Sequence, residues 1–189
     1  MFARRLIFSL AAFTVLWLGW VMLKPAPSLP LVQTQLDGSQ QLDGYRIIPL
    51  ETFSLTARVL AREDYHFDAG AKLSPTDLAL GWNAMADPQV IAAIQITQSN
   101  RWYHWQTEQF PIPRREIEIN SANMHMIPAN PSVAKTLADV REGERIALSG
   151  QLVRVEGEDG FRWVSSLSRE DTGAGACELI WVEQLSRLD

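Results

Sequence analysis

Four side chains in this sequence have the chemistry for metal binding or nucleophilic catalysis. His66, His104 and His125 are the only histidines, and Cys177 is the only cysteine. Three imidazoles with an open position form a familiar catalytic zinc site, in which Asp68 could orient His66. The three histidines are far apart in the sequence, however, and none of the short paired spacings of metal motifs is present. We therefore expect no metal ion and no other cofactor.

Cys177 is a candidate nucleophile, with His125 or His66 as its base. The glycine-rich residues 173–176 before it could offer backbone N–H groups to an oxyanion. Cys177 begins a predicted strand, however, so it lacks the helix N-terminus that often lowers a thiol pKa. An exported hydrolase that uses Cys177 or a histidine-bound metal is therefore the alternative function, and an enzyme is less favoured than a binding protein.

A second set of candidates combines aromatic and polar side chains in segments that we expect to be loops. Such mixtures suit recognition of a peptide or a small polar ligand. The simpler interpretation is that the large side chains fill the core while the polar ones hold irregular backbone. The sequence thus predicts a binding or assembly module of unknown ligand. Its candidate binding residues are Tyr65, His66, Asp68, Trp82, Asn123 and His125.

The N-terminus predicts a membrane anchor. Residues Leu6–Leu23 carry no charge and would span roughly 27 Å as a helix, close to the thickness of a hydrocarbon core. Arg4 and Arg5 precede this segment, so the positive-inside rule keeps residues 1–5 cytoplasmic. Lys24 and the prolines after it disfavour cleavage, although a cleaved signal peptide is the alternative. We expect a single-pass protein of a bacterial inner membrane, with a periplasmic C-terminal domain.

Composition limits what the exported part can bind. Residues 24–44, with three prolines, are predicted to form a tether, and residues 45–189 one domain. Of the 17 lysines and arginines, only Arg4 and Arg5 precede Lys24, which leaves 15 against 22 aspartates and glutamates. An excess of acidic residues makes nucleic acid an improbable partner. An envelope protein or a membrane complex is the expected partner.

The pattern of the domain predicts an α+β fold. Residues 53–59 and 145–155 alternate as strands do, and residues 161–164 and 178–182 complete a C-terminal meander. Capping signals predict short helices over 74–80, after Asp87-Pro88, and over 132–140. Residues 116–119 alternate and are expected to be extended. We predict a curved antiparallel sheet or a small barrel with two or three short helices. An OB-like barrel is one of the options.

Several stretches carry a resemblance to a family of bacterial membrane-anchored proteins. These stretches are residues 65–71, 73–82, 121–125, 165–167 and 175–178. The resemblance spans roughly residues 55 to 183, implies a bacterial origin and one exported domain, and implies no catalytic role. Residues 143–153 separately look like a strand of OB-type barrels.

Overall fold

The structure, a computed structural model, describes residues 33–35, 37–171, 173 and 175–188. Within this part of the chain, no helix is both long enough and apolar enough to cross a membrane. The predicted anchor, Leu6–Leu23, lies outside the described residues, as do residues 1–5 and the first part of the predicted tether, residues 24–32. The anchor therefore stays a sequence prediction.

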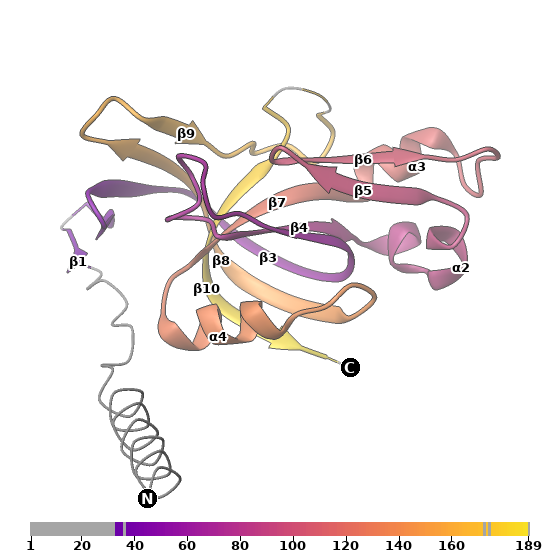
Figure 1. Cartoon of the computed structure of the whole chain (residues 1–189), viewed down its shortest axis with the longest axis horizontal. Helices are drawn as coiled ribbons and strands as arrows, with labels where there is room; N and C mark the ends of the chain where they lie inside the picture. The colour runs from indigo at the N-terminus through magenta and orange to yellow at the C-terminus, as the bar shows by residue number, and fades with distance from the viewer. Residues whose placement is uncertain (1–32, 36, 172, 174, 189) are drawn as a thin grey trace, which may run out of the picture. The chain divides into compact units, whose positions relative to one another are not determined.

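Five strands close into a barrel (Figure 1). Their order is β3-β4-β7-β10-β8, and β8 pairs back onto β3. Every neighbouring pair is antiparallel except β7 and β10, which are parallel. Because the barrel is closed, each of these five strands has a hydrogen-bonded neighbour on both sides. The strands are β3 (Tyr45–Asp64), β4 (Thr76–Gly81), β7 (Ser121–Pro128), β8 (Arg145–Gly157) and β10 (Glu178–Arg187).

Shorter elements extend or cover the barrel. The sheet continues through β1 (Gln33–Thr34) and β2 (Gln40–Leu42) beyond β3, and through β9 (Arg162–Val164) beyond β8. Residues 40–44, which we expected in the tether, thus form β2 and its turn. A separate hairpin is made of β5 (Gln95–Ser99) and β6 (Trp102–Gln106). The helical segments are η1 (Asn83–Ala86), α2 (Pro88–Ile91), α3 (Arg114–Ile119) and α4 (Pro131–Asp139).

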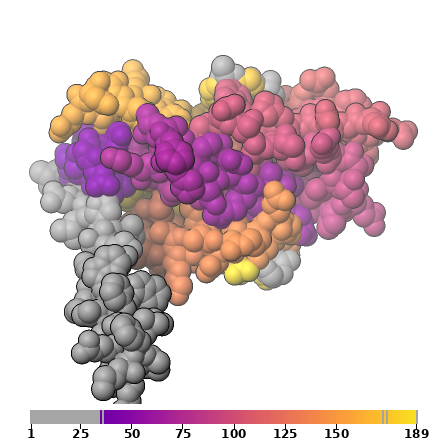
Figure 2. Space-filling view, viewed as in Figure 1, coloured from indigo at the N-terminus to yellow at the C-terminus, as the bar shows by residue number. Residues whose placement is uncertain are grey.

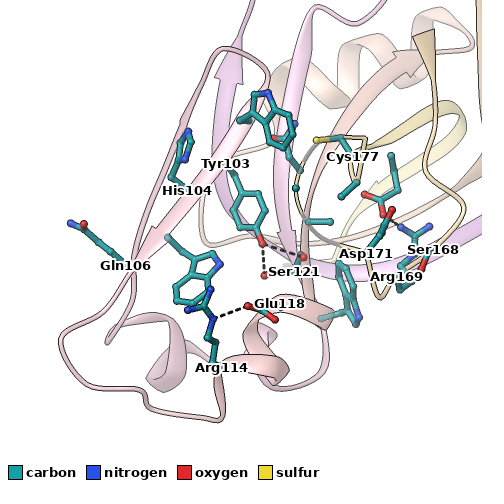
Figure 3. Close-up of a pocket in the computed structure, with 18 of the residues that line it drawn as sticks. Tyr103, His104, Gln106, Arg114, Glu118, Ser121, Ser168, Arg169, Asp171 and Cys177 are labelled. Atoms are coloured by element: carbon teal, nitrogen blue, oxygen red, sulfur yellow. Dashed lines mark hydrogen bonds and ion pairs between the residues drawn. The ribbon is translucent and has the colours of Figure 1, made fainter.

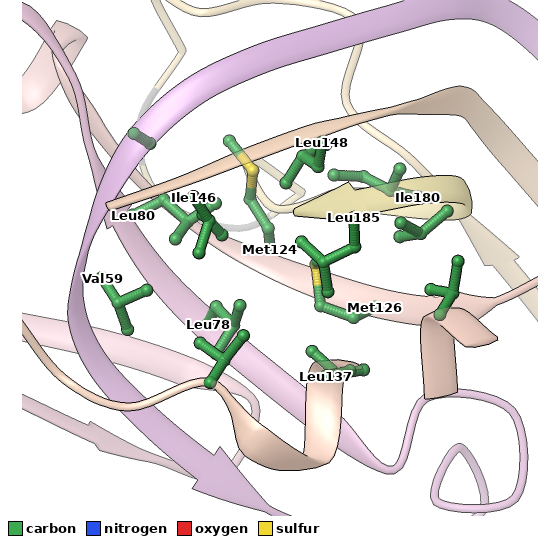
Figure 4. Packing of buried hydrophobic residues seen from close by; sticks show 14 of the residues in the cluster. Val59, Leu78, Leu80, Met124, Met126, Leu137, Ile146, Leu148, Ile180 and Leu185 are labelled. Carbon is green, nitrogen blue, oxygen red and sulfur yellow. The ribbon is translucent and has the colours of Figure 1, made fainter. Parts of the chain in front are cut away.

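Alternate residues of the five barrel strands fill its interior (Figure 4). Because side chains alternate along a strand, Leu78 and Leu80 of β4 point inward while Asp77 lies on the outer surface. The same alternation sends Met124 of β7 into the core and His125 outward. Helix α4 covers one end of the barrel, where its side chains join the core. Polar residues of β4 and β7 therefore lie together on the outside of the barrel wall, although they are buried from solvent.

Gly150 of β8 marks a close approach between strands, as its position in the middle of a predicted strand suggested. A Cβ atom there would lie 2.0 Å from the carbonyl oxygen of Trp181. The pairing of β8 with β10 shifts register next to this point, between Val182 and Gln184. Only a residue without a side chain fits where β10 is bulged against β8.

The predicted α+β class is wrong, because the protein is mostly β, with 48% strand and 15% helix. Residues 76–80 of the predicted helix over 74–80 belong to strand β4 instead. Ser74-Pro75 resembles a helix start, but Leu78 and Leu80 have the period-two spacing that the barrel uses. Residues 116–119 belong to helix α3, since four alternating residues fit either period. Residues 121–125, expected to be a loop, belong to the buried strand β7.

Candidate functional site

A pocket of about 560 Å³ lies between β6, helix α3 and the segment before β10 (Figure 3). On the face shown in Figure 2, the β5–β6 hairpin lies beside yellow residues of that segment. Five aromatic side chains line the pocket, together with charged and small polar groups. The aromatic residues are Trp82, Trp102, Tyr103, Trp105 and Phe110. A concave surface with this composition suits an organic ligand.

A tight turn positions the β6 wall of the pocket. Asn100 and Arg101 both have positive φ, at 53° and 68°, and Ser99 pairs with Trp102. Two consecutive residues of positive φ identify the type I′ turn, whose twist matches a hairpin. Tyr103 and Trp105 then face the domain and pack against its third apolar cluster. The turn therefore fixes which β6 side chains face inward.

Helix α3 and strand β7 complete this side of the pocket. The Tyr103 hydroxyl lies 3.0 Å from Ser121 Oγ, and burial raises the pKa of Tyr103. Arg114 Nε donates to Glu118 Oε1 at 2.8 Å, and its guanidinium lies 5.7 Å from the centre of the Trp105 ring. The charged groups of α3 are thus held by each other and by the aromatic wall.

The opposite wall carries an ion pair between a partly exposed arginine and a buried glutamate. Arg169 pairs with Glu178, and its guanidinium lies 4.7 Å from the centre of the Phe53 ring. Burial lowers the pKa of Arg169, although the negative charges of Asp171 and Glu51 act in the opposite direction. The Glu178 side chain is 1% exposed, and its Oε2 has no hydrogen-bond partner among the described residues.

Cys177 lies at the pocket but is a poor nucleophile. Burial raises the pKa of its thiol to about 11, and the negative charge of Asp77 adds to the rise. A hydrogen bond with Asn123 acts in the opposite direction. The thiol also lies 3.9 Å from the carbonyl oxygen of Arg101. Since only the thiolate attacks, this environment suppresses reaction at neutral pH.

Next to the pocket, a polar network on the outer surface of the barrel centres on Asp77, whose side chain is 0% exposed. Its carboxylate accepts from Arg101 Nη1 and lies at the same distance, 2.8 Å, from His125 Nδ1. The His125 ring lies 4.5 Å from the Trp163 ring, centre to centre. Ser74 also donates to Asp77. The buried charge of Asp77 is therefore fully surrounded by donors.

Arg101 clamps the hairpin tip to the barrel. Besides Asp77, it pairs with Asp68 at 2.8 Å. Its guanidinium lies 3.8 Å above the Tyr65 ring, and its backbone N–H donates to the Tyr65 hydroxyl at 2.9 Å. Burial alone would raise the pKa of Asp68, but the hydrogen bonds and charge of Arg101 outweigh it and lower that pKa. The clamp thereby fixes β6, and with β6 one wall of the pocket.

Asn123 joins the network to the pocket. Its Nδ2 donates to the Arg101 carbonyl at 3.1 Å, and its Oδ1 accepts from Gln98 Nε2 at 2.6 Å. Asn123 also contacts Cys177 and lines the pocket. This single amide therefore connects β7, the hairpin and the segment before β10.

The sequence-predicted residues fall into three groups. Tyr65, Asp68, Asn123 and His125 lie in the network, and Trp82, Asn123 and Cys177 line the pocket. His66 lies apart on an exposed loop, where its ring contacts Phe67. The three histidines do not converge, because His104 lies on the exposed face of β6 and His125 is buried. Across the described ranges, no group of three or more histidine, cysteine or acidic side chains has an arrangement suited to a metal ion.

Sequence reasoning missed the residues that organise the site. Asp77 was assigned to the first turn of a helix, and Arg101 was not considered. The signal for Arg101 was a two-residue interval between two alternating segments, which begins with Asn100, a residue type that tolerates the positive φ of a hairpin turn. Glu178 and Arg169 gave no signal, because an ion pair between a loop and a strand start has no sequence pattern.

Comparison of the sequence with protein-family models finds no match, and comparison with curated proteins finds none either. The resemblance to bacterial membrane-anchored proteins therefore stays a sequence prediction.

Proposed function

We propose that this protein is a binding module whose ligand enters the pocket beside β6. The observation that carries the proposal is the concentration of five aromatic side chains around one cavity of about 560 Å³. Trp102 is 37% exposed although it is a large apolar side chain. Aromatic residues with a few polar groups around them are typical of recognition surfaces.

The chemistry of the pocket favours binding over catalysis. The thiol of Cys177 has a raised pKa, and its hydrogen bonds within the described residues are to an amide and a backbone carbonyl, with no histidine among these partners. His125, the only buried histidine, is engaged by Asp77 on the outer surface of the barrel. A nucleophile needs a base within hydrogen-bond reach, and the described contacts of Cys177 include none. These contacts favour the binding module over the alternative hydrolase.

We also infer that the partner is an envelope protein or membrane complex on the exported side of a bacterial inner membrane. The support is the sequence alone, through Arg4, Arg5 and the uncharged segment Leu6–Leu23. Extraction of native membranes with alkaline carbonate tests this inference: an anchored chain stays in the pellet, and release into the supernatant contradicts it.

The tryptophans offer a direct test of ligand binding. Trp82, Trp102 and Trp105 line the pocket, whereas Trp163 and Trp181 lie elsewhere. A library of neutral, cationic and anionic fragments and short peptides is added to the full chain, and the indole N–H signals are followed by NMR. Binding at the pocket moves the signals of the three lining tryptophans and leaves those of Trp163 and Trp181 in place. Hits that move the signals of Trp163 and Trp181 as much as those of the three lining tryptophans, or that move none of these signals, would overturn the proposal.

The variant Trp102→Ala tests whether binding takes place at the pocket. We expect it to weaken binding of any hit about tenfold, because packing of a ligand group on one exposed ring contributes about 1–2 kcal/mol. Phe67→Ala is the control, since Phe67 is 100% exposed and does not line the pocket. Equal losses in the two variants would show that binding is not at the pocket.

A further inference from the structure

The pocket follows an edge of strand β6 instead of one of its faces. Side chains of a strand alternate between two faces, so a pocket against one face touches every second residue. This pocket is lined by every residue from Trp102 to Thr107 without a gap. Figure 3 shows Tyr103 on one side of the strand and His104 and Gln106 on the other. A cavity that touches both sides must lie along the edge, where the backbone is.

That edge is open in the described part of the chain. β6 pairs only with β5 among the described strands, and it contacts β7 through the Tyr103 side chain, so no described strand is hydrogen-bonded to its second edge. Trp102 closes the two-residue turn with Ser99, which makes Trp102, His104 and Gln106 the hydrogen-bonded partners of β5. The N–H and C=O groups of Tyr103 and Trp105 then point the other way. No hydrogen bond from a described residue reaches them.

We infer that the ligand of the pocket is an extended peptide segment of another protein, which pairs with β6 as a third strand. The inference rests on the proposed binding function. Backbone groups at an open edge recognise the backbone of an incoming strand, and flanking pockets select its alternate side chains. β6 is five residues long, so roughly 17 Å of edge accommodates about five peptide residues.

The walls of the pocket define the side chains that fit. The inner set of peptide side chains would face Trp82, Ala122 and Cys177, which are apolar or nearly so. The charged lining consists of Glu118, Asp171 and Glu178 against two arginines, Arg114 and Arg169. The buried Glu178 Oε2, without a described partner, is an acceptor at the same site. A peptide without net negative charge therefore fits best.

Selection from a random heptapeptide display library against the full chain supplies the probe. The selected peptides are synthesised with single N-methyl groups at each position. In a paired strand, alternate N–H groups donate to β6, so N-methylation at one alternate set should weaken binding about tenfold. Methylation at the other set should change it less than about twofold. Equal sensitivity at all positions would show that the peptide binds without strand pairing.

Amide hydrogen exchange of the protein provides the second measurement. In the free protein we expect Tyr103 and Trp105 to exchange quickly and His104 and Gln106 slowly. The peptide should slow Tyr103 and Trp105 at least about tenfold and leave the other two unchanged. Slowing of the same two amides by protein concentration alone would instead assign the edge to a second copy of the chain and overturn the inference.

The two proposals fail in different ways. If no peptide is selected while small fragments still move the signals of the three pocket tryptophans, the binding function stands and strand pairing is wrong. If neither peptides nor fragments act at the pocket, both proposals are wrong.

Discussion

The network around Asp77 and the pocket beside β6 lie next to each other and use the same kinds of side chain. In the network, each charged or aromatic group is matched by another: Arg101 contacts two carboxylates and the Tyr65 ring, and Trp163 covers His125. In the pocket, the Trp102 ring is 37% exposed, and one carboxylate oxygen of Glu178 has no hydrogen-bond partner among the described residues. The types of side chain therefore do not distinguish the structural network from the candidate binding pocket. The two regions differ in whether their side chains already have partners within the described chain.

The comparison predicts that the network is essential for stability. Asp77→Ala leaves the guanidinium of Arg101 and the ring of His125 without their shared partner. Loss of one member of a buried ion pair is expected to lower the free energy of unfolding by about 3 kcal/mol. Urea denaturation measures the loss. Asp139→Ala, at an exposed position of α4, is the control and should change the value by less than about 0.5 kcal/mol. A similar small effect of both substitutions would remove the distinction between the two regions.

The thiol at the boundary of the two regions should react slowly. A pKa of about 11 instead of the ordinary 9 leaves about 100-fold less thiolate at pH 8. Because burial disfavours the charged form, the rate of alkylation by iodoacetamide should keep rising with pH up to about 11. The double variant C177A/E158C, with its thiol in an exposed turn, provides the reference rate. Fast alkylation of Cys177 at neutral pH, with a plateau, would instead support the hydrolase.

The pocket surface should contribute least to stability. Trp102→Ala removes a ring that is 37% exposed, so we expect a change of less than about 1 kcal/mol in the free energy of unfolding. Trp181→Ala is the matched comparison, because Trp181 is buried in the second apolar cluster and its loss should cost about 3 kcal/mol. Equal losses would show that Trp102 belongs to the core and that the pocket is a packing feature.

Local signals predicted the parts of the fold that depend on neighbours in sequence. Asn130 caps α4 through a hydrogen bond from the Val133 N–H, as the Asn130-Pro131 pair indicated. β8 was predicted over residues 145–155 from their alternation, and the strand extends two residues further, to Gly157. β7 was not predicted, because Asn123 and His125 made its outer side look like a loop. The polar atoms of Asn123 find partners in the β5–β6 hairpin, and those of His125 in Asp77. These contacts join distant parts of the chain, so no local sequence pattern indicates them.

The site itself was only partly predictable. Tyr65, Asp68, Asn123 and His125 were identified as candidates from their types, but they were assigned to ligand binding, and four of their contacts are internal. Their meeting point, Arg101, is 24 residues from Asp77 in sequence. Contacts of this kind depend on the closed barrel, and two of its five strands, β4 and β7, were predicted as a helix and a loop.

The parallel pairing of β10 with β7 has a consequence for how the chain folds. β10 is the last strand in the described chain, and it fills the gap between β7 and β8. Until residues 178–187 are available, both of those strands keep an unpaired edge and Glu178 has not reached Arg169. Folding must therefore wait for contacts between distant parts of the chain, a topology associated with slow barrel formation. A nascent chain that stops before β10 would have two strand edges with unpaired backbone groups, which could pair with other chains, and it would lack one wall of the pocket.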